Sequence, residues 1–267
     1  MLEARLQKAD LLKKIVEAMK ELVQDVNIDC TPGGLALQAM DSSHVSLCYL
    51  ALNIEAFEHY RCDRNVSLGV SLESLSKILK CAGNDDSVTI KADQGTDIVN
   101  FMFENADQDR LSDFELKLMD IDSEQLGIPP TDYKATVTMP SNEFQRIIRD
   151  LGVLGDTCVI SVAKDGVRFS VQGDMGTGNI TVKPTAAAVD KKAGVSITMD
   201  EPVELNFAVR YLKTFTKATP LAANVSISLS PDVPLVVEYK MEQSGHIRYY
   251  LAPKIDDEDG EGEAVAA

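Results

Sequence analysis

The sequence predicts an α+β protein made of two similar β-rich units, each carrying two short helices. Apolar and polar residues alternate through most of the chain, as in Val66–Leu72 and Val203–Phe207. This period of two is typical of half-buried strands in antiparallel sheets. Turn-forming clusters such as Pro32-Gly33-Gly34, Lys164-Asp165-Gly166 and Gly176–Asn179 separate these segments.

The second half of the chain repeats the first, which is the third observation behind this fold class. A shift of 132 residues superposes the helix-like segment Leu12–Met19 on Phe144–Leu151, and a shift of 137 superposes Leu72–Lys80 on Val209–Lys217. Strand-like segments follow the same shifts: Gly34–Gln38 falls on Gly166–Ser170, and Val88–Ile90 on Val225–Ile227. Chance similarity between hairpins is the alternative, but helices, turns and strands agree together, which favours two copies of one unit.

Four segments have helical spacing and concentrate positive charge. They are Lys8–Glu21, Leu72–Ala82, Ser141–Leu151 and Val209–Ala218. They hold 11 of the 26 Lys and Arg but only 6 of the 42 Asp and Glu, so they carry +5 in a chain of net charge −16. Their apolar residues must lie on the sheets, which leaves the cations on the outer faces. One such helix would mean little, but four of the same sign indicate a cationic face for a polyanion.

Two segments depart from this pattern. Leu118–Lys134 contains Gly127, Pro129 and Pro130, which predict an irregular connector between the copies. The acidic end lacks large apolar groups and is expected to be disordered. We therefore expect a first domain at 1–117, a connector at 118–134, a second domain at 135–256 and a tail at 257–267.

Composition excludes several classes of protein. The chain has no Trp and only 6% aromatic residues, which disfavours a base-stacking single-strand binder. Five cysteines without CxxC spacing and three scattered histidines predict reduced thiols and no zinc or other cofactor. The N-terminus resembles no secretory signal, and the longest apolar runs are too short for a membrane span, so we expect no membrane association.

An enzymatic interpretation finds little support. Asp120 and Asp122 form a D-x-D pair, and Asp41, Ser43 and His44 cluster in the sequence. On an extended strand Ser43 and His44 would point in opposite directions, and no nucleophile turn surrounds them. Short carboxylate spacings are expected by chance with 42 acidic residues. We expect no catalysis, and a monomeric acidic scaffold that never touches DNA remains the other alternative.

Several strings resemble the proliferating cell nuclear antigen family, the sliding clamps of eukaryotic DNA replication. They are MDSSHVSL (Met40–Leu47), the segment Tyr60–Asp85, QLGIP (Gln125–Pro129), FTKATPL (Phe215–Leu221), DVPLVVEYK (Asp232–Lys240) and YYLAPKI (Tyr249–Ile255). The resemblance runs from Leu2 to Ile255. It implies a homotrimeric ring around duplex DNA, with helices lining the hole and sheets outside.

The resemblance also implies positions for the DNA-facing and joining residues. The expected DNA-binding cations are Lys13, Lys14, Lys20, Arg61, Arg64, Lys77, Lys80, Arg146, Arg149, Arg210, Lys213 and Lys217. The expected subunit interface joins strands near Asp109–Lys117 and Met175–Lys183, with Cys81, Leu111, Phe114, Leu116, Met175, Ile180 and Val182. Many members have Tyr where this chain has Phe114, which removes any hydroxyl hydrogen bond there.

The family further docks peptides of the form Q-x-x-aliphatic-x-x-aromatic-aromatic beneath the connector. The matching pocket positions are Met40, His44, Val45, Leu47, Leu126, Ile128, Pro129, Pro234, Tyr250, Ala252, Pro253 and Ile255. From the residues alone, Leu126 and Ile128 could simply pack on the sheet. Lys164, in an exposed turn, matches the position that accepts ubiquitin or a related modifier, whereas Gly127 replaces a second modifiable lysine. The implied partners are a clamp loader, the replicative polymerase, flap endonuclease and DNA ligase, and the implied location is the nucleus.

Overall fold

The computed structural model describes residues 1–93, 95–122, 126–129, 131–185 and 194–254. Its first half contains β1 (Leu2–Leu6), α1 (Ala9–Met19), β2 (Asp25–Thr31), β3 (Gly34–Met40), β4 (Ser46–Asn53), β5 (His59–Cys62), β6 (Val66–Ser71), α2 (Leu72–Leu79), β7 (Ser87–Ala92), β8 (Ile98–Glu104) and β9 (Leu111–Lys117), with a 3₁₀ turn at Ile54–Ala56. Its second half contains β10 (Ala135–Pro140), α3 (Ser141–Leu151), β11 (Thr157–Ala163), β12 (Gly166–Gly173), β13 (Gly176–Val182), β14 (Ser196–Met199), β15 (Val203–Ala208), α4 (Val209–Phe215), a 3₁₀ helix (Thr216–Leu221), β16 (Asn224–Leu229), β17 (Leu235–Lys240) and β18 (Gly245–Leu251). The described residues of 118–134 form neither helix nor strand.

The internal repeat is confirmed element by element. Shifting α1 and β2 by 132 residues gives the bounds of α3 and β11, and shifting β6 and β7 by 137 gives those of β15 and β16. The remaining elements follow the same order in both halves. Two copies of one supersecondary unit therefore form this chain, as the sequence predicts.

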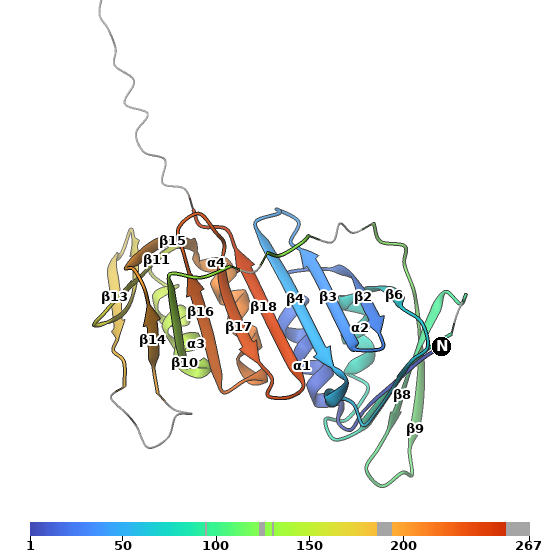
Figure 1. The fold of residues 1–267 in the computed structure, drawn as a ribbon. Helices are drawn as coiled ribbons and strands as arrows, with labels where there is room; N and C mark the ends of the chain where they lie inside the picture. The colour runs from blue at the N-terminus through green and yellow to red at the C-terminus, as the bar shows by residue number, and fades with distance from the viewer. Residues whose placement is uncertain (94, 123–125, 130, 186–193, 255–267) are drawn as a thin grey trace, which may run out of the picture.

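Sheet pairing joins the two copies in a way the sequence does not reveal. The strands form a five-stranded sheet β5-β1-β7-β8-β9, a nine-stranded sheet β14-β10-β16-β17-β18-β4-β3-β2-β6 and a four-stranded sheet β13-β12-β11-β15. The nine-stranded sheet crosses the boundary between the copies, because β18 pairs antiparallel with β4, with Tyr249 opposite Cys48. Figure 1 shows this sheet in front of the helices, with β9 and β13 at opposite ends of the molecule.

The helices pack through their apolar faces onto the sheets. In α1 the buried residues include Leu12, Ile15 and Val16, and α1 lies against both α2 and the 3₁₀ helix of the other half. The predicted helices are slightly long: α1 ends at Met19, and α4 ends at Phe215 before the 3₁₀ helix that contains Pro220. Proline has no amide hydrogen and disfavours a regular α-helical turn there.

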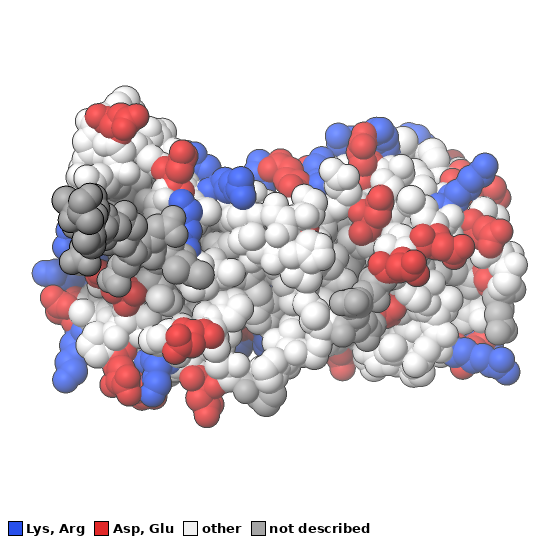
Figure 2. Space-filling view, turned by 90° about the horizontal axis from the view of Figure 1, so that it is seen from above, with Lys and Arg blue, Asp and Glu red and all other residues white. Residues whose placement is uncertain are grey.

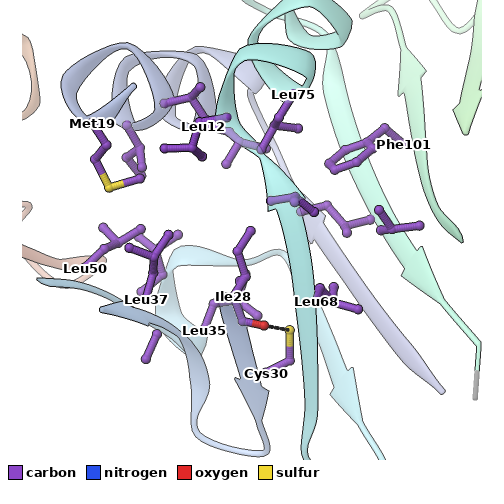
Figure 3. Close-up of a pocket in the computed structure, with 18 of the residues that line it drawn as sticks. Leu12, Met19, Ile28, Cys30, Leu35, Leu37, Leu50, Leu68, Leu75 and Phe101 are labelled. Atoms are coloured by element: carbon purple, nitrogen blue, oxygen red, sulfur yellow. Dashed lines mark hydrogen bonds between the residues drawn. The ribbon is translucent and has the colours of Figure 1, made fainter. Parts of the chain in front are cut away.

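A small apolar cavity of about 40 Å³ lies in the first core, between α1, α2 and the sheets. Figure 3 shows side chains of α1 and α2 facing those of β3, β4 and β6 across it. Two of its lining residues are smaller than their counterparts in the second core: Val16 corresponds to Ile148, and Leu37 corresponds to Phe169. The apolar walls of the cavity offer no partner to water.

Filling this cavity should stabilise the protein. Val16→Ile adds one methylene next to the void, and we expect the free energy of unfolding to rise by about 0.5–1 kcal/mol in urea titrations at fixed protein concentration. The matched control, Ile148→Val at the equivalent buried position of the second core, should lower the free energy of unfolding by about 1 kcal/mol. A fall in stability for Val16→Ile would mean that the void cannot accept the extra group.

Candidate functional site

The first cationic surface lies over α1 and α2. Lys13, Lys20, Lys77 and Lys80 border two neighbouring hollows there. Between them, Ser76 donates a hydrogen bond from its hydroxyl to Glu17 at 3.0 Å, which ties the two helices together. Four predicted DNA-binding residues thus meet on one face. Figure 2 shows Lys and Arg side chains gathered along the concave edge of the molecule, interspersed with acidic ones.

Most of these cations have an acidic neighbour. Lys20 lies 2.6 Å from Glu17, Lys14 lies 2.6 Å from Asp10, and Lys77 lies 2.6 Å from Glu73. The hydrogen bond from Lys20 lowers the pKa of Glu17, so its carboxylate stays ionised. Exposed pairs of this kind contribute only about 0–1 kcal/mol each, so a phosphate can compete for the ammonium groups.

The second half presents a similar surface on α3 and α4. Arg146 and Arg149 both pair with Asp150, and Lys213 donates a hydrogen bond to the carbonyl of Gly152 at 2.8 Å. The guanidinium of Arg210 lies 4.9 Å from the centre of the Tyr211 ring. The ammonium group of Lys217 lies 3.3 Å from the carboxylate of Glu21, which belongs to the first half. The helical cations of both halves therefore belong to one surface.

Arg61 and Arg64 lie apart from the cations of the four helices, and their DNA-binding role stays a prediction. Arg61 lies on β5 and pairs with Asp63 at 2.8 Å. Arg64 lines a separate hollow with residues of the β7–β8 turn and the start of the connector. The predicted DNA-binding segment of the family, Arg61–Lys80, is continuous in the sequence. In the structure its first part belongs to β5 and β6, and only its last part belongs to α2.

The candidate docking surface is a row of side chains across three neighbouring strands. Met40 of β3 is opposite Leu47 of β4, and Leu47 is opposite Tyr250 of β18. Val236 of β17 continues the row beside Tyr250. Because Cys48, next to Leu47, points into the core, this row lies on the face of the sheet away from the helices. Burial raises the pKa of Tyr250, whose phenol stays neutral.

The connector and the sheet line an open hollow of about 700 Å³ that includes Tyr250 and Val236 of this row but not Met40 or Leu47. Leu126, Ile128 and Pro129 line it from above, and Tyr250 lines it from the sheet. Leu126 and Ile128 keep 42% and 38% of their surface exposed, so they do not simply pack on the sheet. These four predicted pocket residues share one cavity.

The same hollow includes residues that the sequence did not single out. Gln38 donates a hydrogen bond from Nε2 to the carbonyl of Leu126 at 2.8 Å, which holds the connector over β3. Tyr133 lines the hollow near the other end of the connector, and Arg248 pairs with the buried Glu238 at 2.6 Å on its floor. No local sequence signal marks them, because Gln38, Glu238 and Arg248 come from three different strands.

The β3–β4 turn forms one border of the docking surface. Ser43 and His44 lie in this turn and not on an extended strand, so the geometric reason given against a Ser–His pair was wrong. His44 adopts a left-handed φ of 57°, and the carbonyl of Val45 accepts a hydrogen bond from the amide of Ala252 at 3.1 Å. Pro234 precedes β17, and Pro253 follows Ala252. Ile255 lies outside the described residues.

The predicted interface residues lie at the two free edges of the chain. Leu111, Phe114 and Leu116 are on β9, and Cys81 follows α2 at the same end. Ile180 and Val182 are on β13 at the opposite end, next to Met175. Leu111 and Met175 expose 65% and 76% of their surface, whereas Leu116 is buried in its own core. Among the strands of the described residues, β9 pairs only with β8 and β13 only with β12, so each leaves one ladder edge open.

The structure also gives the positions of Lys164 and of the five cysteines. Lys164 is exposed in the β11–β12 turn. Among the five cysteines, Cys81 is exposed and the others are buried as free thiols. Over the described residues, no group of three or more His, Cys, Asp and Glu side chains is arranged to hold a metal ion. The helices in that part of the chain are too short or too polar to cross a membrane.

Comparison with protein families agrees with this architecture. Residues 1–125 match the model of the proliferating cell nuclear antigen N-terminal domain. Residues 127–254 match the model of the proliferating cell nuclear antigen C-terminal domain. The two matches cover both copies of the repeated unit, with its helices on one face of antiparallel sheets. The chain belongs to the proliferating cell nuclear antigen family of DNA sliding clamps.

Proposed function

We propose that three copies of this chain close into a ring that encircles duplex DNA and serves as a processivity factor for the replicative polymerase. The observation that carries this proposal is the match between the inner junction and the free edges. By the internal repeat, β9 is the counterpart of β18, and β13 is the counterpart of β4. Since β18 and β4 pair inside the chain, β9 of one chain can pair with β13 of the next. The edge pairing does not set the number of copies in the ring, and we take three from the family resemblance.

The internal repeat also gives the register of this interface. Following the ladders strand by strand, Phe114 is the counterpart of Tyr249 and Gly178 that of Cys48. Tyr249 is opposite Cys48 in the inner junction, so Phe114 would face Gly178 of the next subunit. A Cβ at position 178 would lie 2.4 Å from Leu154 and 2.9 Å from Leu151, so glycine makes room for these two leucines, and the Phe114 ring of the next subunit would pack near them.

Such a ring places the cationic helices around the DNA. Duplex DNA carries about one negative charge per 1.7 Å of axis, and the helical lysines and arginines would attract it without regard to sequence. Most of these cations already have an acidic neighbour, which keeps each phosphate contact weak. Weak contacts permit sliding, while closed topology retains the ring. The acidic remainder of the surface would repel DNA from everywhere else.

Partner docking is the second part of the proposal. The row Met40–Leu47–Tyr250 and the exposed Leu126 and Ile128 offer an apolar socket beneath the connector, suited to a short helical turn with aromatic side chains. We propose that the replicative polymerase, flap endonuclease, DNA ligase, mismatch-repair and other repair proteins dock here through the family's peptide motif, after a clamp loader has opened the ring in the nucleus. The same surface serves many partners because it recognises only a short motif.

We also propose Lys164 as the site for ubiquitin or a related modifier. Its exposed position in a tight turn makes the ammonium group accessible to a conjugating enzyme. A modifier there would recruit damage-tolerant polymerases for translesion synthesis without entering the docking socket.

The docking assignment predicts a loss of peptide affinity in Ile128→Ala. A fluorescent peptide with the family motif should bind the variant about 10-fold more weakly, because an apolar anchor of the socket is removed. Ile54→Ala is the control and should leave peptide affinity unchanged, because Ile54 is a similarly exposed isoleucine (45%) that follows β4 at the end away from the β3–β4 turn. Equal binding by wild type and Ile128→Ala would disprove the assignment.

The experiment that tests the whole proposal is a mass measurement in solution combined with DNA retention. A ring predicts a three-chain mass and loader-dependent retention on circular DNA that is lost when the DNA is linearised. A one-chain mass without retention would favour the acidic scaffold. Turnover of a substrate by the purified protein alone would favour an enzyme.

A further inference from the structure

A buried carboxylate organises the β3–β4 turn beside the docking surface. Asp41 is only 6% exposed. Its Oδ1 accepts hydrogen bonds from the amides of Val45 at 2.9 Å and Ser46 at 2.7 Å, and its Oδ2 accepts one from the amide of Ser43 at 3.2 Å. A buried charge needs such donors to offset its lost hydration.

The fourth donor comes from the other half of the chain. Tyr211 of α4 donates a hydrogen bond from its hydroxyl to Asp41 Oδ2 at 2.7 Å, and Tyr211 is itself 6% exposed. Burial by itself would raise the pKa of Asp41, but these hydrogen bonds outweigh burial and lower it, so the group stays ionised. Oδ2 therefore depends mainly on Tyr211, since its other bond, from Ser43, is longer.

The turn that Asp41 organises carries one side of the docking surface. His44 has a left-handed φ of 57°, which costs a non-glycine residue energy that the turn must offset. On its other side the turn is joined to the C-terminal strand, because Ser46 donates from its hydroxyl to the Tyr250 carbonyl at 2.9 Å and Val45 accepts from Ala252. The position of this turn therefore sets the spacing between His44 and Val45 on one side and Tyr250 and Ala252 on the other.

We propose that Tyr211 is a positioning residue for partner docking: its hydroxyl fixes the Asp41 carboxylate and, through it, the β3–β4 turn. This inference rests on the proposed docking function. Tyr211 lies on a DNA-facing helix and has no place in the predicted socket, so it would act only through Asp41. Without the hydroxyl, Oδ2 keeps only the 3.2 Å bond from Ser43, and the turn samples arrangements that a peptide must reorder before it can bind.

The test is a peptide titration of the full-length Tyr211→Phe variant, which removes one oxygen atom and keeps the ring. We expect the Kd of the fluorescent motif peptide to rise about 3- to 10-fold. Hydrogen exchange at the amides of Ser43, Val45 and Ser46 should become faster by a comparable factor, because these amides are bonded to Asp41. The mass of the assembly should not change.

Tyr60→Phe is the matched control. It also loses a hydroxyl, whose single proton is shared between the carbonyls of Thr31 and Gly34, but it lies away from the docking surface. Its peptide affinity should equal that of the wild type. Equal affinity for Tyr211→Phe and wild type, or an equal loss in Tyr60→Phe, would overturn the inference.

A second variant separates this inference from the docking proposal. Asp41→Asn keeps the shape of the side chain but replaces one acceptor oxygen by a donor, and it should weaken the peptide at least as much as Tyr211→Phe. If the wild type fails to bind the peptide at all, the docking proposal fails. If Ile128→Ala weakens binding while Tyr211→Phe and Asp41→Asn do not, only the role of Tyr211 is refuted.

Discussion

Replacing Phe114 with alanine is expected to convert the ring into single chains. The register derived from the internal repeat places this side chain opposite Gly178 of the next subunit, where it would pack near Leu151 and Leu154, which lie beside the glycine. Removing a buried aromatic ring at an interface costs about 3 kcal/mol, which raises the dissociation constant of each contact about 100-fold. Light scattering over a dilution series should show a one-chain mass for Phe114→Ala at concentrations where the wild type remains assembled.

Phe114→Tyr is expected to have the opposite effect and to stabilise the interface. In the inner junction Tyr249 donates a hydrogen bond from its hydroxyl to the carbonyl of Ala18 at 2.9 Å, and the counterpart of Ala18 is Asp150. A tyrosine at 114 should reach that carbonyl in the next subunit and add about 1 kcal/mol per interface. The ring would then persist at lower concentrations. An unchanged mass for Phe114→Ala, with circular dichroism confirming a folded chain, would refute the proposed edge pairing.

The second large effect is expected on the helical surface. Neutralising Lys20, Lys77 and Arg149 together should lower polymerase stimulation about 5- to 10-fold while the assembly keeps its mass. Lys20 directly follows α1, Lys77 lies on α2 and Arg149 lies on α3, so the change removes positive charge at three helices of the proposed hole. The salt dependence of DNA binding should also become weaker, with its logarithmic slope smaller by about 2–3.

A matched variant distinguishes local charge from net charge. Neutralising Lys91, Lys164 and Lys240 changes the total charge by the same amount, but these residues lie on β7, in the β11–β12 turn and on β17. Polymerase stimulation should remain near the wild-type value in this control. Equal losses in both variants would mean that DNA responds only to overall charge, and the helices would lose their assignment as the DNA face.

The partner surface shows where prediction from the sequence was weakest. Family resemblance supplied Ile128 and Tyr250, and the structure brings them to one hollow. It did not supply Gln38, whose hydrogen bond holds the connector, or the link between Asp41 and Tyr211, which are 170 positions apart. Such contacts depend on which strands and helices become neighbours, and no local pattern encodes that.

The sequence by itself determined the repeated unit, its helices and strands, and the sorting of charge onto four helices. These are local properties, because hydrophobic period and turn chemistry act over a few residues. Only the tertiary structure decided that β18 and β4 join the two copies into one nine-stranded sheet, which leaves β9 and β13 as matching open edges. It also separated Arg61 and Arg64 from the helical cations. Strand pairing between distant segments depends on the assembled core, in which each sheet must bury its apolar face against the helices.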